Sequence, residues 1–394
     1  MKIFLDFFIR HFHAEFLGYC LNGSQVLSII LNNDLSPQLL RRSPILPSQH
    51  TYRLLILLTV LLLLPQSGMG GEKIPAADLV VDGQQIDLGQ KKFQILFQEL
   101  EQEHGFSKKE LDIFFQGITI NRRVLVLMDK QWEAKPYFQY RPLFITPSVI
   151  KKAKKKLREH KNILDRIEQE LGVDMEVVIA IWGIESRFGS HNGGYGVLQT
   201  LTTLFDAYPR RAAFFRKQLV HFLLLCRENG YDPLLITGSY AGAFGQCQFI
   251  PSSFREYALS FDGDKRRDVF GSIEDILASI ANYLHSYHWV LAAPLYSDIG
   301  STLNGQELIS ANLEGRKGLV NWRLVAKIQG VSLPPAPENA ELTIVSLEKD
   351  PAEGGGIRYV AGYPNFQAIT QWNHSNRYAM AVSELAEAIQ EKKD

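Results

Sequence analysis

The strongest helical pattern of the chain lies in residues 174–189, which read DMEVVIAIWGIESRFG. Residues spaced three or four apart share one face of the predicted helix: Val178, Ile181, Trp182 and Glu185. Asp174 stands at the expected N-cap, and the glycines that follow Phe188 predict the end of the helix and a loop beyond it. The pattern therefore predicts a buried helix that carries one acidic residue on its apolar face.

Apolar residues at helical spacing predict further helices along most of the chain. They fall at residues 93–100, 107–115, 149–171, 198–205, 209–229, 273–289 and 378–389. Two pairs have the spacing of a helix cap: Ser107 with Glu110, and Ser253 with Glu256. Residues 135–147 mix aromatics with prolines and cannot form one long helix, because proline removes a backbone donor. Residues 124–128 fit a helix and a strand equally well.

Strand-like composition is confined to the last part of the chain. Residues 342–347 and 357–361 are rich in β-branched side chains and flank a turn with proline and glycines at residues 350–356, which predicts an antiparallel hairpin. The sequence therefore predicts a mainly α fold of the α+β class, with a small antiparallel β element near the C-terminus.

Residues 54–64, LLILLTVLLLL, form the most apolar run of the chain. The run is shorter than the roughly 20 residues that a membrane-spanning helix needs. Basic and small residues flank it: Arg41, Arg42 and Arg53 before it, and Ser67, Gly68, Gly70 and Gly71 after it. This order is typical of a secretory signal, so we expect export to the periplasm or cell envelope. The alternative is a short anchor that is not cleaved, in an inner or an outer membrane. We expect residues 1–72 to be an N-terminal extension and residues 73–394 to be the functional domain.

Composition and charge are those of an ordinary soluble enzyme. Of 394 residues, 46% are hydrophobic and 21% are charged. Lys plus Arg and Asp plus Glu both number 42, so the balanced charge gives no indication of a nucleic-acid partner. The three cysteines (Cys20, Cys226 and Cys247) are too few for a disulfide scaffold, and the sequence leaves open whether Cys226 pairs with Cys247.

One local excess of positive charge lies at residues 149–161. It comprises Lys151, Lys152, Lys154, Lys155, Lys156, Arg158 and Lys161. The interpretation that we prefer is a solvated helix face. The alternative is attraction to an anionic polymer of the cell envelope.

Glu185 is the leading candidate for chemistry. A carboxyl group among Trp and Ile side chains loses hydration, which favours its protonated form. A Glu that keeps its proton near neutral pH serves as the general acid of glycosidases. The competing interpretation is structural, with Glu185 paired to Arg187 or Arg211 at the helix end.

Six sequence blocks carry a family resemblance. In chain order they are KPYFQYRPLF, GIESRFG, YPRRAAFF, GSYAGAFGQCQFIPSSF, SIANYL and QWNHSNRYAMAV. Together they resemble the membrane-bound lytic murein transglycosylase B family, glycoside hydrolase family 103, over residues 93–389. The resemblance implies a lysozyme-like helical core at about residues 148–300, with flanking helical and β subdomains. It also implies cleavage of the MurNAc-GlcNAc β-1,4 bond of peptidoglycan to 1,6-anhydromuramyl products.

The resemblance also implies a set of site residues. The family motif Gly-[Ile/Val]-Glu-[Ser/Thr]-Arg-[Phe/Trp]-Gly places the catalytic acid at Glu185. The implied substrate-binding residues are Tyr140, Arg210, Arg211, Ser239, Gln248, Tyr283, Trp372, Asn373 and Tyr378. Trp372 stands where many relatives have Tyr, which keeps an aromatic face but removes a hydroxyl. The expected partners are peptidoglycan glycan strands and other proteins of cell-wall remodelling.

Two other functions compete with this expectation. A hydrolytic muramidase would use water and a second carboxylate, and no second acid stands out in the matched blocks. A catalytically silent peptidoglycan-binding scaffold would not need the intact Glu185 motif together with Ser239, Gln248 and Asn373. The sequence therefore favours the transglycosylase.

Relatives can carry an EF-hand-like calcium loop at the position of residues 260–275. The acidic residues that such a site would use here are Asp262, Asp264 and Glu274. Three positions depart from the loop pattern: Ser260 at the first ligand, Lys265 where EF-hand loops have Gly, and Gly271 at the twelfth position. We therefore expect no required cofactor, and the departures disfavour calcium.

Overall fold

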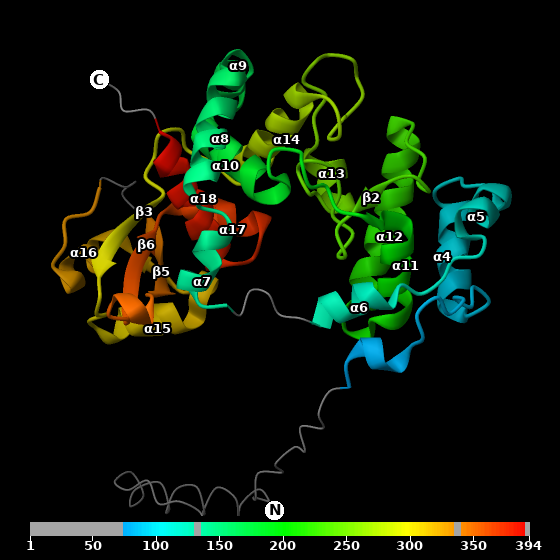
Figure 1. Cartoon of the computed structure of the whole chain (residues 1–394), viewed down its shortest axis with the longest axis horizontal. Helices are drawn as coiled ribbons and strands as arrows, with labels where there is room; N and C mark the ends of the chain where they lie inside the picture. Colours follow the sequence, from blue (N-terminus) through cyan, green and yellow to red (C-terminus); the bar gives the residue numbers. More distant parts are fainter. Residues whose placement is uncertain (1–73, 130–134, 335–339, 391–394) are drawn as a thin grey trace, which may run out of the picture. The chain divides into compact units, whose positions relative to one another are not determined.

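The computed structural model describes residues 74–129, 135–334 and 340–390, whose helices and strands are shown in Figure 1. The apolar run at residues 54–64 and the predicted N-terminal extension lie outside the described residues. The described residues belong to one unit, Ile74–Asp394. Within this described part, no helix is both long and apolar enough to cross a membrane.

Three helices open the described part: α4 (Lys91–Gln102), α5 (Lys108–Phe115) and α6 (Arg122–Asp129). The predicted capping box starts α5, because Ser107 accepts a hydrogen bond from the Glu110 backbone and Glu110 accepts one from the Ser107 backbone. Residues 124–128, whose sequence fits a helix and a strand equally well, lie in α6, where Val124 and Leu125 are buried.

The helical core follows. Its helices are α8 (Pro147–Glu159), α9 (Lys161–Leu171), α10 (Met175–Ser186), α11 (Val197–Ala207), α12 (Ala212–Asn229), α13 (Pro251–Tyr257) and α14 (Ile273–Ser286). The prediction of one continuous helix at residues 149–171 was wrong. His160 leaves the helical conformation (φ −110°, ψ 19°) and places its ring 5.7 Å from that of Trp182, so α8 and α9 are separate.

The helix caps differ from the prediction at two places. Ser253 does not cap a helix but lies inside α13, which begins at Pro251 because proline is favoured at a first helical position. Asp174 occupies the N-cap position of α10, but its carboxylate accepts hydrogen bonds from Trp289 Nε1 and the Ala292 backbone instead. Asp174 therefore ties α10 to the segment after α14.

The helix α10 is buried on all sides rather than on one face. Every residue from Val177 to Gly183 is buried. The helix also ends earlier than predicted, at Ser186, because Arg187 and Phe188 adopt positive φ angles of 51° and 60°. The chain therefore turns directly after Ser186, before the glycines are reached.

A four-stranded antiparallel sheet occupies the late part of the chain. Its order is β3 (Tyr296–Gly300), β6 (Ile357–Gly362), β5 (Glu341–Glu348) and β4 (Leu319–Asn321). The predicted hairpin is confirmed as β5 and β6, paired from Thr343 with Gly362 to Glu348 with Ile357. The outer strands β3 and β4 were not predicted. The helices α15 (Gln306–Glu314) and α16 (Trp322–Gln329) pack on this sheet, and together they form a small separate hydrophobic core.

The last helices complete the helical core. They are α17 (Pro364–Trp372) and α18 (Asn376–Ile389), and α18 packs against α10 and α8. A one-turn helix, α7 (Tyr137–Tyr140), and the 3-10 turn η4 (Arg141–Leu143) precede α8 and lie beside β5. The mainly α fold with small antiparallel sheets is as predicted.

Candidate active site

A pocket of about 280 Å³ lies at the end of α10. Its lining residues come from three segments: Tyr140, Leu143 and Phe144 from α7 and η4, Ile184 and Glu185 from α10, and Asn373 and Tyr378 from the last two helices. Among these described lining residues, Glu185 is the single carboxylate. An apolar pocket with one acid and a few polar groups is suited to general acid catalysis.

Tyr378 fixes the carboxyl group of Glu185. Its phenol donates a hydrogen bond to Glu185 Oε1 at 2.5 Å. Burial and the neighbouring Glu185 raise the pKa of the Tyr378 phenol well above its usual value, so the phenol keeps its proton and acts as the donor. Ser375 places Tyr378 by accepting a hydrogen bond from the Tyr378 backbone N–H. The contact therefore orients the carboxyl group of Glu185.

The turn after Glu185 is strained and held by its surroundings. Positive φ angles at Arg187 and Phe188 are uncommon for residues other than glycine and persist only where neighbouring structure determines them. Lys152 of α8 donates a hydrogen bond to the Arg187 carbonyl at 2.9 Å, and its ammonium lies 5.1 Å from the centre of the Phe188 ring. The basic helix therefore supports the segment that carries Glu185.

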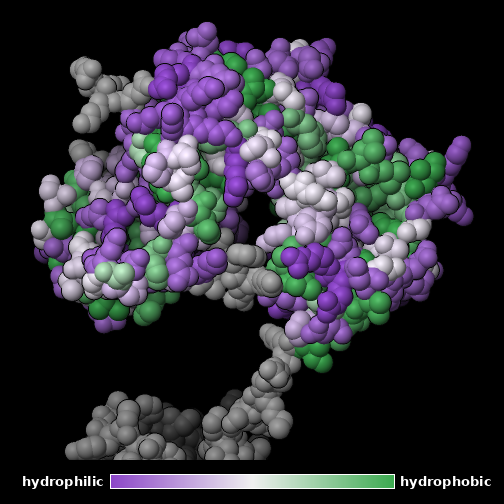
Figure 2. Space-filling view, in the orientation of Figure 1, coloured by the Kyte–Doolittle hydropathy of each residue, from purple (hydrophilic) through white to green (hydrophobic). Residues whose placement is uncertain are grey.

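The basic run at residues 149–161 accordingly has two faces. Lys152 and Lys156 lie over the rings of Phe188 and Trp182. A neighbouring face of α8 is exposed and includes Lys151, Lys155 and Arg158. Figure 2 shows a mostly hydrophilic surface over α8. The exposed face fits the solvated interpretation, while the support of Phe188 by Lys152 was not predicted.

Gln246 is a site residue that the sequence reasoning missed. Its side chain accepts a hydrogen bond from Trp182 Nε1 at 2.9 Å and donates one to the Phe270 carbonyl at 2.8 Å. A Cβ atom at Gly189 would lie 2.2 Å from Gln246 Oε1, so this glycine is required for close approach. The sequence signal that could have indicated Gln246 is the pair of glutamines on either side of Cys247 in residues 245–248.

Ser239 and Gln248 organise the loops near the site. The hydroxyl of Ser239 accepts hydrogen bonds from the backbone of Ala241 and Ala243. Gln248 has a φ of 50° and donates to the carbonyls of Gly245 and Asn192. Both side chains already form hydrogen bonds to the backbone of nearby loops. Their contacts with substrate stay a prediction.

Tyr283 and Trp372 belong to an aromatic layer. Tyr283 is buried and donates a hydrogen bond to the Gln371 carbonyl at 2.7 Å. Trp372 is half-buried, and its ring centre lies 4.7 Å from that of Tyr283 and 5.0 Å from that of Phe249. Asn373 follows at the end of α17 and lines the pocket. The aromatic layer therefore adjoins Asn373, which lines the pocket.

The two adjacent arginines, Arg210 and Arg211, point in different directions. Arg210 pairs with Asp129 at 2.7 Å, and Arg211 places its guanidinium 4.3 Å from the Phe214 ring centre. Among the described residues that line the Glu185 pocket, neither arginine is found. Their role in substrate binding stays a prediction.

Cys226 and Cys247 are both buried and free, so they do not form the disulfide that the sequence left open. Burial raises the pKa of the Cys226 thiol to about 12. The Cys247 thiol is fully buried, and burial and the nearby Glu185 raise its pKa well above the usual value. Neither thiol is prepared to act as a nucleophile.

The acidic loop at residues 260–275 brings together Asp262, Asp264 and Asp275, with carboxylate oxygens within 4.8 Å of one another. Asp275, and not the predicted Glu274, is the third member, because Asp275 turns inward from α14. Its oxygens accept backbone hydrogen bonds from residues 261, 262 and 268. Since backbone donors of the loop already use these oxygens, the residues fit a calcium ion poorly.

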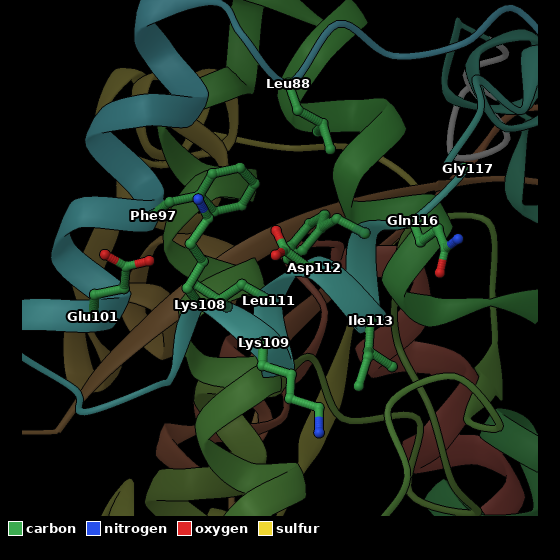
Figure 3. Close-up of a pocket in the computed structure, with 11 residues that line it drawn as sticks. Leu88, Phe97, Glu101, Lys108, Lys109, Leu111, Asp112, Ile113, Gln116 and Gly117 are labelled. Atoms are coloured by element: carbon green, nitrogen blue, oxygen red, sulfur yellow. The ribbon is translucent and has the colours of Figure 1, made fainter.

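A larger pocket of about 540 Å³ lies between α4 and α5, and Figure 3 shows its lining residues. Its apolar members are Leu88, Phe97, Leu111, Ile113 and Phe115. Its charged groups (Glu101, Lys108, Lys109 and Asp112) are exposed. Exposed charges remain hydrated, so the acidic groups of this pocket are poorly suited to hold a proton near neutral pH.

Comparisons with known proteins agree with the geometry of the Glu185 pocket. A family model described as "Transglycosylase SLT domain" matches residues 89–387. Membrane-bound lytic murein transglycosylase B of Escherichia coli (strain K12) is 33% identical over 306 residues, which cover 75% of this chain and 82% of that protein.

Solved structures show the same relationship. The catenated lytic transglycosylase SltB1 from Pseudomonas aeruginosa matches with a TM-score of 0.70 and 35% identity, over 76% of this chain and 97% of that one. SltB3 from Pseudomonas aeruginosa, in complex with NAG-NAM-pentapeptide, matches with a TM-score of 0.64 and 30% identity, over 76% of this chain and 79% of that one. The predicted family and the lysozyme-like fold are confirmed. The chain therefore belongs to the lytic transglycosylases with an SLT domain, which are lyases that act on peptidoglycan.

Proposed function

We propose that this lytic transglycosylase cleaves the β-1,4 bond between N-acetylmuramic acid and N-acetylglucosamine, with Glu185 as its single acid and base. The observation that carries the proposal is the pocket in which Glu185 is the single carboxylate among the described lining residues and is held by Tyr378. Similarity to SltB3, which was solved with NAG-NAM-pentapeptide, supports the same class of glycan as the substrate.

The reaction needs one proton, which Glu185 donates first and recovers later. Glu185 protonates the glycosidic oxygen as the bond to the muramyl C1 breaks. The resulting carboxylate takes the proton of the muramyl C6 hydroxyl, whose oxygen bonds to C1 and closes a 1,6-anhydro ring. Water is not consumed, and Glu185 regains its proton. The hydrogen bond from Tyr378 stabilises the carboxylate in the middle of this cycle.

An intramolecular nucleophile explains why one carboxylate is sufficient. Hydrolysis by the ordinary glycosidase routes needs two carboxyl groups, one as acid and one as base or nucleophile. Here the C6 hydroxyl is part of the substrate, so its proximity to C1 replaces the activation of water. Tyr140, Leu143 and Phe144 form a largely apolar wall of the same pocket as Glu185.

The remaining site residues act on the glycan around the bond that breaks. Tyr140 and Asn373 line the pocket and contact the sugar rings and their N-acetyl groups. Trp372 and Tyr283 provide the aromatic layer behind Asn373. Ser239 and Gln248 shape neighbouring loops, and Arg210 and Arg211 bind carboxylates of the peptide or lactyl groups.

The enzyme acts in the periplasm or at the cell envelope. Residues 1–72, with the apolar run at 54–64, serve as the export extension, and residues 73–394 form the catalytic domain. Its relative in Escherichia coli is named a membrane-bound enzyme, which supports a place near the wall. Peptidoglycan strands are its partner, together with proteins of wall remodelling.

The test of the acid is Glu185→Gln, assayed by release of soluble muropeptides from purified peptidoglycan. Loss of general acid catalysis should lower turnover by at least about 10²-fold. Glu314→Gln, an exposed glutamate on α15, serves as the control and should keep wild-type turnover. Wild-type turnover in a folded Glu185→Gln protein would overturn the assignment.

A further inference from the structure

The pocket wall opposite Glu185 has little structure of its own. It consists of the one-turn helix α7 (Tyr137–Tyr140), the turn η4 (Arg141–Leu143) and the next residue, Phe144. Tyr140, Leu143 and Phe144 line the pocket. A single helical turn is not stable by itself, because its terminal backbone groups outnumber its internal hydrogen bonds. Contacts with the rest of the fold must therefore set the position of this wall.

The first such contact is the carboxylate of Glu384 on α18. Its Oε2 accepts hydrogen bonds from the Tyr137 phenol at 3.0 Å and from Arg141 Nε at 2.5 Å. Its Oε1 accepts a third from Arg358 on β6 at 2.6 Å. The Glu384 side chain is only 11% exposed, so these interactions are weakly screened by solvent. One carboxylate thus joins both ends of α7 to the helix that carries Tyr378.

The second contact is the carboxylate of Glu348 at the end of β5. Its Oε2 accepts a hydrogen bond from the Tyr137 backbone N–H at 2.9 Å, and its Oε1 accepts one from Arg377 at 2.7 Å. Burial alone would raise the pKa of Glu348, but the Tyr137 N–H and Arg377 lower it below its usual value. Glu348 therefore stays ionised. It links Tyr137, the first residue of α7, to Arg377, which directly precedes Tyr378 in the chain.

We propose that Glu384 and Glu348 are positioning residues, which hold the Tyr140 wall at a fixed distance from Glu185 and thereby set the affinity for the glycan. The inference rests on the proposed function, because it assumes that the glycan binds between this wall and Glu185. Neither residue lines the pocket, so both act through Tyr137 and Arg141. The late sheet, far from the acid in sequence, then contributes to substrate binding.

The chain offers a matched control for this arrangement. Tyr296 on β3 donates a hydrogen bond to Glu387 at 2.6 Å, one turn after Glu384 on the same helix. Both pairs join a tyrosine phenol to a glutamate of α18, but the Tyr296 pair does not involve α7. Replacing either tyrosine with phenylalanine removes one hydrogen bond and keeps the ring. Only the Tyr137 change loosens the pocket wall.

The experiment measures kcat and KM of the full-length enzyme on soluble, uncross-linked peptidoglycan strands for Tyr137→Phe and Tyr296→Phe. Loss of one hydrogen bond to a charged acceptor should raise KM of Tyr137→Phe roughly tenfold. Its kcat should change much less, because the Tyr378 contact with Glu185 is intact. Tyr296→Phe should keep the wild-type KM. Hydrogen exchange of the backbone at residues 137–144 should become faster in Tyr137→Phe only.

A second pair of variants tests the carboxylate itself. Glu384→Gln keeps the shape of the side chain but loses its charge, and it should raise KM as Tyr137→Phe does. Asp298→Asn removes the negative charge of the other acidic partner of Arg358, whose Nε donates to Asp298 Oδ1 at 2.6 Å, and it should leave KM unchanged. Equal KM values for Tyr137→Phe and Tyr296→Phe, or for Glu384→Gln and Asp298→Asn, would overturn the inference. The proposed function fails separately, through retained turnover in Glu185→Gln.

Discussion

The phenol of Tyr378 donates a hydrogen bond of 2.5 Å to Glu185 Oε1, across 193 positions of the chain. The acid comes from the buried helix α10, and its donor comes from the last helix, α18. Because α18 packs directly on α10, the catalytic pair forms only when the C-terminal part of the fold is in place. The packing of α18 against α10 therefore brings Glu185 and Tyr378 together.

Removing this donor should slow catalysis without unfolding the protein. In Tyr378→Phe the carboxylate of Glu185 loses a hydrogen bond worth about 1.5–3 kcal/mol, so kcat should fall roughly 10- to 100-fold. Tyr363→Phe is the control, because Tyr363 is also buried but donates to the Pro334 carbonyl. Steady-state kinetics that give equal kcat values for the two variants would contradict a role of Tyr378 in the chemistry.

Gly183 should not tolerate a side chain. A Cβ atom there would lie 2.7 Å from Phe188 Cζ, so Gly183→Ala must displace the ring that supports the turn after Glu185. Alanine gains about 1 kcal/mol over glycine inside a helix, but overpacking costs about 1–3 kcal/mol, so the net effect is a loss of stability. Gly194→Ala is the control, since nothing lies within 4 Å of its Cβ position. We expect a lower Tm and lower activity in Gly183→Ala alone; a Tm at or above that of Gly194→Ala would argue against this packing.

His160 should make stability depend on pH. Burial, aided by Lys156, lowers the pKa of its imidazole in the folded state, so the unfolded chain binds more protons near the ordinary His pKa of about 6.5. Stability therefore rises with pH through this range and is lost as pH falls through the folded-state pKa. His160→Phe keeps a ring on Trp182 and removes the proton site. Thermal melts at about pH 5.5 and about pH 7.5, on either side of that value, should show a smaller Tm difference in the variant. An unchanged difference would exclude His160 as the source.

Calcium should not stabilise the protein. The Asp275 carboxylate accepts three backbone hydrogen bonds, and Asp262 accepts from the Asp264 backbone and the Ser272 hydroxyl, so an ion would have to displace these donors. The nearby Arg266 and Arg267 also reduce the attraction for a cation. Calorimetric titration of chelator-treated protein with calcium should show no binding heat and no rise in Tm. Binding heat that disappears in Asp264→Asn would contradict this expectation.

The sequence predicted the elements that depend on local pattern. The periodicity of Val178, Ile181 and Trp182 placed α10 and its acid, and β-branched residues placed the hairpin of β5 and β6. The predicted helix range 149–171 also has the observed end, because α9 stops at Leu171 and Gly172 caps it with a φ of 64°. These features depend on spacing and on the conformational freedom of single residues, both of which are visible in one sequence.

Other features depend on contacts between distant segments and could not be predicted in this way. His160 divides α8 from α9 because its ring packs on Trp182 of another helix. The strands β3 and β4 are short and lack a strong pattern, and pairing with the hairpin creates them. The holding of α7 by Glu384 joins residues 247 positions apart, and nothing in the local sequence of either indicates the other.

Digestion of purified peptidoglycan in ¹⁸O-enriched water, followed by mass analysis of the muropeptides, tests the central claim most directly. Attack by the muramyl C6 hydroxyl predicts products one water lighter than hydrolysis products, with no incorporated ¹⁸O and no reducing muramic end. Products that carry ¹⁸O at a reducing muramic end would show that water is the nucleophile and would contradict the account in which Glu185 alone serves as acid and base.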